Sequence, residues 1–464
     1  METNTSATKA LLEGHSVRSL VLRLGVPAMF GQFFNLLYSI VDRVFVGRLP
    51  QGGELALAGI GICAPALTAV TAFAYMVGIG GAALMSISLG QQNADRARQA
   101  LGNAFWLLVG IGAAVTAVLL PLHKPLLYLL GCSDALYPYA GPYFTVYILG
   151  TLASLLGVGL NQFLLAQGFA RQGMIAVVLG ALTNVVLDPL FLFGLRLGVV
   201  GAAAATVLSQ CVMAVYVVVQ LCRPGMPVPL RLHRPRAALC RRIVAIGSMS
   251  FLITLLDNFI IILLNIVLRQ YGGDRGDALI TCATVVQSFL TIVFCPSQGI
   301  TTGCGTIFSY HYGAGNYPKV RQAFWWVFVL CGVYIGLLEL AVQAVPGVFA
   351  GLFLQDEALI GLASVCLRRY TLALLGVAVQ YALVDSLTAM GKVRYAFPLS
   401  IFRKLLYLVC LVVLPRLGPV ENVFYAGSLS DLAGATFSVV VFFLFVLPRL
   451  RREMQQPAGQ TKKS

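Results

Sequence analysis

Four aspartates lie inside long apolar stretches of the sequence, and they are the residues best placed to do chemistry: Asp42, Asp188, Asp257 and Asp385. A charge at the centre of a membrane helix costs at least about 2.5–3.5 kcal/mol on insertion scales, so a carboxylate there calls for a functional explanation. A buried carboxylate can hold a proton or a cation, because desolvation and repulsion between like charges both favour the neutralised form. These aspartates are therefore the first candidates for a coupling-ion site.

The two aspartates of the first half have polar neighbours at helical spacing. Tyr38 and Asp42 are four residues apart and share one face of a helix, as do Asn184 and Asp188. Pro189 follows directly and removes a backbone donor beside the Asp188 carboxylate. Both aspartates therefore belong to polar faces of otherwise apolar helices.

Asn161 and Thr206, from neighbouring apolar stretches, add further oxygen atoms. Carboxylate, amide and hydroxyl oxygens suit Na⁺, and we expect such a site at Asp42, Asn184, Asp188 and Thr206 if the ion is not a proton. The alternatives are structural: Asp42 pairs with Arg43 or Arg48, and Asp188 caps the helix break at its proline.

The second half offers a different set of acids. Tyr381 and Asp385 are spaced i, i+4 and share one helix face, while Asp257 lies in an earlier stretch. The alternative for both aspartates is a buried carboxylate paired locally, for example with Arg394 or Arg403. Asp431 is expected to be an amino-terminal helix cap without a functional role.

The composition identifies the elements that must hold these residues. Of 464 residues, 59% are hydrophobic and 11% charged, and the mean hydropathy is +0.86, whereas soluble proteins have about 25% charged residues. An apolar run of about 20 residues spans a bilayer. Twelve such runs are predicted: Val17–Val46, Ala56–Ser88, Ala97–Leu119, Tyr137–Ala166, Gly173–Phe193, Val199–Leu221, Ile243–Leu268, Ala278–Ser309, Val320–Val342, Ile360–Met390, Phe397–Leu414 and Phe424–Leu447.

An internal repeat organises these runs. LGQQNADRARQA, which begins at Leu89, recurs as YGAGNYPKVRQA, which begins at Tyr312, at an offset of 223 residues. Gly80 and Gly303 match at this offset, and we attribute both to close helix packing through small residues. Two copies of six helices predict an all-α membrane protein, with two six-helix bundles related by a pseudo-twofold axis along the membrane normal. The predicted divisions are 1–222, a basic linker 223–242, a second bundle 243–450 and a tail 451–464.

The basic residues predict the orientation. With both termini in the cytoplasm, 23 of the 32 Lys and Arg residues fall on the cytoplasmic side, as the positive-inside rule requires. This count includes Arg403 and Lys404. The same distribution explains the net charge of +15 without nucleic acid, which we do not expect as a partner. The linker contacts either solvent or anionic lipid headgroups.

Several stretches resemble the multidrug and toxic compound extrusion family. They run in family order from about Val17 to Arg449: VPAMFGQFFNLLYSIVDRVFVGRLP, LGQQNADRARQA, LLAQGFARQGM, LTNVVLDPLFLFGLRLGVVGAAAATVLSQ and AMGKVRYAFPLSIFRK. The pattern is most similar to the bacterial DNA-damage-inducible and archaeal branch. That resemblance implies an amino-terminal-lobe site at Asp42, Asn161, Asn184, Asp188 and Thr206, and it implies a helix-bending role for Pro27.

The second half departs from that branch. At the 223-residue offset, Asp42 falls on Asn265 and Asp188 on Leu411, so the carboxylate pair is not repeated. Tyr381 and Asp385 instead resemble another branch of the family, which has a cation site in the carboxy-terminal lobe, with Asp257 where that branch has a glutamate. The sequence leaves open which lobe couples the ion.

The function expected from these features is a multidrug efflux antiporter of the inner (plasma) membrane, which exports small, often cationic organic compounds in exchange for protons or Na⁺. We expect a monomer without a cofactor. No GxxxxGK[ST] phosphate-binding element occurs, so ATP is not expected to drive transport directly. The alternative is a flippase for lipid-linked saccharides, which would need many basic residues inside the helices. An intramembrane enzyme would need clustered His or a Ser–Lys or Ser–His pair, and the sequence offers neither.

Overall fold

The computed structural model describes residues 12–47, 53–232, 234–449 and 451, and these residues are almost entirely helical, without a strand among them. The elements of the first half, from Val17 on, are α2 (Val17–Gly47), α3 (Gly53–Gly90), α4 (Ala94–Leu129), α5 (Tyr137–Leu149), α6 (Thr151–Ala166), α7 (Ala170–Pro189), the π-helical turn η1 (Leu190–Gly194) and α8 (Gly198–Cys222).

The second half repeats this order with more interruptions. Its elements are α9 (Ala237–Gly272), η2 (Gly273–Arg275), α10 (Gly276–Gly313), α11 (Tyr317–Ala344), α12 (Pro346–Ala350), α13 (Glu357–Thr371), α14 (Leu375–Gln380), η3 (Tyr381–Asp385), α15 (Ser386–Ala389), α16 (Val393–Leu417), η4 (Val420–Phe424), α17 (Tyr425–Val441) and η5 (Phe442–Val446). Because α9 begins at Ala237, the last residues of the segment predicted as linker are helical.

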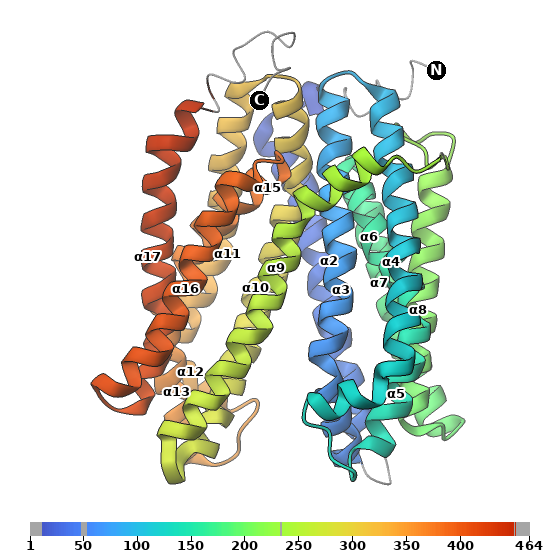
Figure 1. Cartoon of the computed structure of the whole chain (residues 1–464). Coiled ribbons are helices and arrows are strands. Elements are labelled where there is room, and N and C mark those ends of the chain that lie inside the picture. Colours follow the sequence, from blue (N-terminus) through green and yellow to red (C-terminus); the bar gives the residue numbers. More distant parts are fainter. Residues whose placement is uncertain (1–11, 48–52, 233, 450, 452–464) are drawn as a thin grey trace.

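The number of membrane spans matches the prediction. Within the described residues, eleven helices are long and apolar enough to cross a membrane, and the count is twelve if α5 and α6, bent by 56° at Gly150, are taken as one broken span. Figure 1 shows the two halves as bundles standing side by side, with α2 to α8 in one and α9 to α17 in the other. The predicted all-α membrane protein with two six-helix halves is therefore confirmed.

The two bundles meet through their first two helices. The most extensive helix contacts in the molecule join α2 to α10 and α3 to α9, so each bundle's first helix packs on the other bundle's second. These helices meet most closely near the side that holds the linker 223–236 and the turns after α3 and α10, here called the linker side.

Glycines allow the helix backbones to touch where α2 packs on α10 and α3 packs on α9. This interface between the two bundles is here called the seam. A Cβ atom on Gly80 of α3 would overlap the carbonyl oxygen of Ile243 on α9 and crowd the amide nitrogen of Gly247. A Cβ atom on Gly303 of α10 would crowd Leu24 of α2, and Leu24 precedes Gly247 by the same 223 residues. The predicted packing role of Gly80 and Gly303 is confirmed, and it is the same contact made twice.

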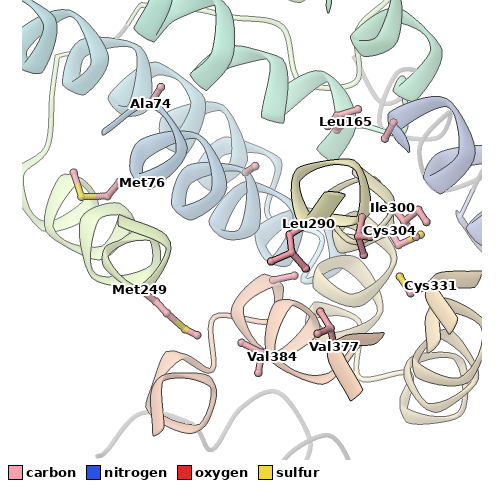
Figure 2. Close-up of a cluster of buried hydrophobic side chains, with 14 of the residues drawn as sticks. Ala74, Met76, Leu165, Met249, Leu290, Ile300, Cys304, Cys331, Val377 and Val384 are labelled. Carbon is pink, nitrogen blue, oxygen red and sulfur yellow. The ribbon is translucent and has the colours of Figure 1, made fainter. Parts of the chain in front are cut away.

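Buried apolar side chains fill the space around the seam. Figure 2 shows Met76 of α3, Met249 of α9 and Leu165 of α6 in one cluster with Ile300 and Cys304 of α10. All five are at most 7% exposed. The core is therefore continuous across the two bundles on the linker side, which closes the molecule there.

We predict that Gly80→Ala destabilises the protein, because the added methyl group meets backbone that cannot rotate away. Overpacking of this kind costs about 1–3 kcal/mol, and the thermal unfolding temperature of the purified protein in detergent should fall. The matched control is Gly61→Ala in the same helix, where a Cβ would meet nothing within 4 Å. Equal unfolding temperatures for the two variants would show that α3 and α9 are not in contact at Gly80.

Candidate functional site

A buried polar site lies where α2, α7 and α8 meet. Asn184 and Asp188 on α7 have no exposed surface. The Asn184 Nδ2 atom donates to Asp188 Oδ1 at 3.2 Å and lies 3.5 Å from Thr206 Oγ1 on α8. The carboxyl group of Asp42 on α2 is close enough to that of Asp188 for a hydrogen bond between them. The structure therefore brings together the four residues named as a cation site from the sequence.

Pro189 shapes the backbone beside the Asp188 carboxylate. It is the last residue of α7, and the chain continues from it into the π-helical turn η1. Because proline has no N–H and a π-helical turn is wider than an α-helical turn, the regular hydrogen-bond ladder is interrupted next to the acid. Such turns occur often at functional sites.

The site has more acceptors than donors. Asn184 Oδ1 and Asp188 Oδ2 are buried and accept no hydrogen bond from the described residues, while Thr206 donates its hydroxyl hydrogen to the Ala202 carbonyl oxygen at 3.0 Å. Two neighbouring carboxyl groups away from water repel each other when both are ionised. The arrangement can therefore share a proton or hold a small cation between oxygen atoms.

Three tyrosines and a glutamine surround the two acids. Tyr38 lies within electrostatic range of Asp42, Asp188 and Tyr147. The Gln210 Nε2 atom of α8 donates to the Tyr147 hydroxyl at 3.1 Å. Tyr38 was expected from the sequence, whereas Tyr147 and Gln210 were not, although Tyr143 and Tyr147 are spaced i, i+4 on α5. Both of these α5 tyrosines are at most 8% exposed.

Asn161 and Pro27 lie elsewhere. The Asn161 Oδ1 atom would be 3.1 Å from a Cβ on Gly173, which is fifteen residues before Asp188, or roughly 22 Å along an α-helix. Its amide therefore lies far from the acid pair in this conformation. Pro27 lies within α2, which continues through it to Gly47 as one helix.

A cavity of about 520 Å³ lies mainly in the second bundle and is closed on one wall by α3. Its lining residues end at Ile79 on α3 and Gln298 on α10, just before the glycine contacts at Gly80 and Gly303. The helix backbones therefore touch at the linker-side end of this cavity. Asp42 and Asp188 do not line this cavity, so the acid pair and the cavity are separate sites.

Asp385 and Tyr381 line the cavity from η3. The Thr301 hydroxyl of α10 donates to Asp385 Oδ2 at 2.6 Å. The Tyr381 ring lies 6.3 Å from that of Phe294, centroid to centroid. Asp385 also borders a smaller polar cavity of about 90 Å³ on the linker side of the first, so its carboxylate faces both spaces.

Asp257 lines the same cavity but belongs to a cluster of four charges. Lys404 Nζ on α16 forms a salt bridge with Asp257 Oδ1 on α9. The neighbouring Arg403 Nη1 atom lies 2.8 Å from Asp431 Oδ1 on α17. These four residues, here called the charge cluster, contain two positive and two negative charges in two pairs.

Two predictions made from the sequence are wrong at this cluster. Arg403 and Lys404 were counted as cytoplasmic, but they lie within α16, where Lys404 is eleven residues, or roughly 16 Å, from the start of the helix. Asp431 was expected to cap a helix, but it is the seventh residue of α17 and is 2% exposed. The alternative that Asp257 is paired locally is supported, but its partner is Lys404, and Arg403, which was named as an example, pairs with Asp431.

Transition-metal chemistry finds no support in the described part of the chain, where no three His, Cys, Asp or Glu side chains come together. The acid pair, the cavity and the charge cluster offer oxygen atoms, opposite charges and aromatic faces, which are the groups that protons, alkali cations and organic cations prefer.

Comparisons with known proteins agree with this architecture. The sequence profile of the MatE family matches residues 27–190 and 250–413, two segments displaced by the same 223 residues as the repeat. The multidrug export protein MepA of Staphylococcus aureus (strain N315) is 23% identical over 434 residues, which cover 93% of this chain and 95% of MepA.

Solved structures match over nearly the whole chain. The outward-facing conformation of a multidrug resistance MATE family transporter superposes with a TM-score of 0.88 at 22% identity, covering 96% of this chain and 98% of that one. A MATE transporter in a straight conformation gives a TM-score of 0.89 at the same identity and coverage. Similarity at this level of identity establishes the fold.

We predict that the Arg403–Asp431 pair stabilises the fold through charge balance. Arg403→Met should cost about 3–5 kcal/mol, because it leaves a buried carboxylate unpaired. The double variant Arg403→Met/Asp431→Leu, which removes both charges, should recover most of the loss. Thermal unfolding in detergent measures both effects. Arg416→Met, at the exposed end of the same helix, is the control and should change stability by about 0.5 kcal/mol or less. A double variant as unstable as the single one would refute the charge-balance explanation.

Proposed function

Because the chain belongs to the multidrug and toxic compound extrusion (MATE) family, and is thus a membrane transporter and not an enzyme, we propose that it is a multidrug efflux antiporter. It exports small organic compounds in exchange for protons or Na⁺ through alternating access. Membership of this family, and similarity to MepA, which is a multidrug export protein, both support the export of several drugs. The coupling ion and its site are our proposal.

The single observation that carries the proposal is the buried contact between Asp42 and Asp188. Their carboxyl groups lie together beside Asn184 and Thr206, and Asp188 and Asn184 are fully buried. Two ionised carboxylates in this position repel each other, and burial disfavours each of them. A proton or Na⁺ that binds between them lowers the free energy of the packed arrangement, so the packing of α2 against α7 depends on the ion.

Coupling then follows from different packing in two states. Ion binding neutralises Asp42 and Asp188 and allows α2 to pack more tightly, with Pro27 as the point where the helix bends. Substrate binds in the larger cavity, where the aromatic rings of Phe294 and Tyr381 offer faces suited to flat organic cations. Because ion and substrate favour different states, each changes the affinity for the other.

The orientation of the cavity supports the same cycle. The seam at Gly80 and Gly303 closes the linker side in this conformation. If the linker and both termini lie on the cytoplasmic side of the inner membrane, as the positive-inside rule favours, the cavity faces outward. The described state is then the one that releases substrate and loads the ion. The inward-facing state requires α2 to part from α10 and α3 from α9.

The experiment is uptake of a fluorescent organic cation into everted membrane vesicles, with a proton gradient or a Na⁺ gradient imposed separately. We predict that Asp42→Asn and Asp188→Asn each reduce gradient-driven uptake at least about 10-fold, which corresponds to the loss of about 1.4 kcal/mol of coupling. The control is Asp95→Asn, which removes an exposed acid on the linker side that pairs with Arg98. It should transport at the wild-type rate.

Two other outcomes point elsewhere. If only Asp385→Asn abolishes uptake, the coupling site lies in the second bundle and the proposed amino-terminal site is wrong. If neither gradient drives uptake, the flippase for lipid-linked saccharides becomes the better explanation. That second function is disfavoured here, because the two basic residues that line the cavity, Arg403 and Lys404, are each paired with a carboxylate.

A further inference from the structure

The ammonium group of Lys404 occupies the position beside Asp257 where a bound cation would lie. Lys404 comes from α16 and Asp257 from α9, and both line the 520 Å³ cavity. We propose that Lys404 is a built-in cation that determines the specificity of the cavity. It neutralises Asp257, so that this carboxylate binds neither a coupling ion nor the charged group of an organic cation. The inference rests on the proposed function in taking this cavity as the substrate site.

The charge cluster gives each basic side chain its own acid. Arg403 turns toward α17, where it pairs with Asp431. Its stem lies against Gly434, where a Cβ atom would be 2.9 Å from the Arg403 Cβ and Cγ atoms. With Arg403 held in this way, Lys404 is the partner of Asp257. The four charges sum to zero, and the second bundle needs no added ion at these residues.

The two members of the pair are buried unequally. The Asp257 side chain is 45% exposed, whereas the Lys404 side chain is 10% exposed. A half-exposed carboxylate that lost its partner would still be hydrated by the cavity and would attract cations. An ammonium that is nine-tenths buried would keep little water if it lost its partner, and the remaining acid, Asp431, is already paired with Arg403, so this is the costly case. The two single substitutions should therefore have different consequences.

A tethered ammonium also competes well with free ions. Lys404 is held in the site by the chain, so it needs no further loss of translational freedom to bind. Lysine carries a compact charge with three donors, which matches the oxygens of one carboxylate. A free monovalent cation must displace this group before it can bind Asp257.

Removing the built-in cation is therefore expected to create a cation site. We predict that Lys404→Met binds tetraphenylphosphonium at least 10-fold more tightly than the wild type, as measured by isothermal titration calorimetry on the purified protein without any ion gradient. NaCl should also raise its unfolding temperature, and by more than it raises that of the wild type. In Asp257→Asn/Lys404→Met both effects should disappear, because the new site is the Asp257 carboxylate.

Three further variants serve as checks. Lys404→Arg keeps the charge and should bind tetraphenylphosphonium like the wild type, which keeps the test open if the methionine variant is unstable. Lys124→Met removes an exposed positive charge elsewhere and should not change binding. Asp257→Asn alone should unfold at a lower temperature than Lys404→Met, because it leaves the buried ammonium unpaired.

The proposal is overturned if Lys404→Met binds the organic cation no more tightly than the wild type. It is also overturned if the double variant binds as tightly as Lys404→Met, since the added affinity would then not come from Asp257. The binding and unfolding measurements do not require the protein to transport, so they test the role of Lys404 separately from the proposed coupling site. If Asp42→Asn and Asp188→Asn keep gradient-driven uptake while Lys404→Met gains affinity, the coupling proposal fails and the role of Lys404 stands.

Discussion

The cost of placing charge inside a membrane governs this molecule. An ionised side chain without water or a partner is expensive there, and each described acid in the helical interior is accompanied by polar groups. The second bundle uses ion pairs and hydrogen bonds, and the first places two acids against each other. The interior contacts are Asp42 with Asp188, Asn184 with Asp188, Thr301 with Asp385, Lys404 with Asp257 and Arg403 with Asp431. Only the first of these brings like charges together, and for that reason it is the contact most sensitive to an added cation.

The two copies of the repeat have kept their packing and lost their common chemistry. Gly80 and Gly303 make equivalent contacts across the seam, but the positions of Asp42 and Asp188 are occupied in the second copy by Asn265 and Leu411. Packing constrains both copies because each supplies half of the same interface. Charge is constrained only where it is used, so the copies were free to diverge into an acid pair on one side and a balanced charge cluster on the other.

Much of this could be predicted from the sequence, for identifiable reasons. Apolar length predicted the spans, and the spacing of Asn184 and Asp188 placed both on one helix face. Arg403, Lys404 and Asp431 were misplaced because rules for basic residues and helix caps treat charges one at a time, whereas these residues are buried only because they meet one another. The positions of Tyr147 and Gln210, and the distance between Asn161 and Asp188, depend on how neighbouring helices cross. The spacing of residues within one helix carries no information about that crossing.

The repeated glycine contact has a consequence for the symmetry of the chain. Each copy carries both surfaces of the seam: its second helix presents the glycine, and its first helix presents the backbone that the glycine meets. Two separate copies of a six-helix unit could therefore pair through this contact twice around a twofold axis, as isologous homodimers do. The interface between the bundles therefore has the twofold form of an isologous homodimer whose two subunits are connected through residues 223–236.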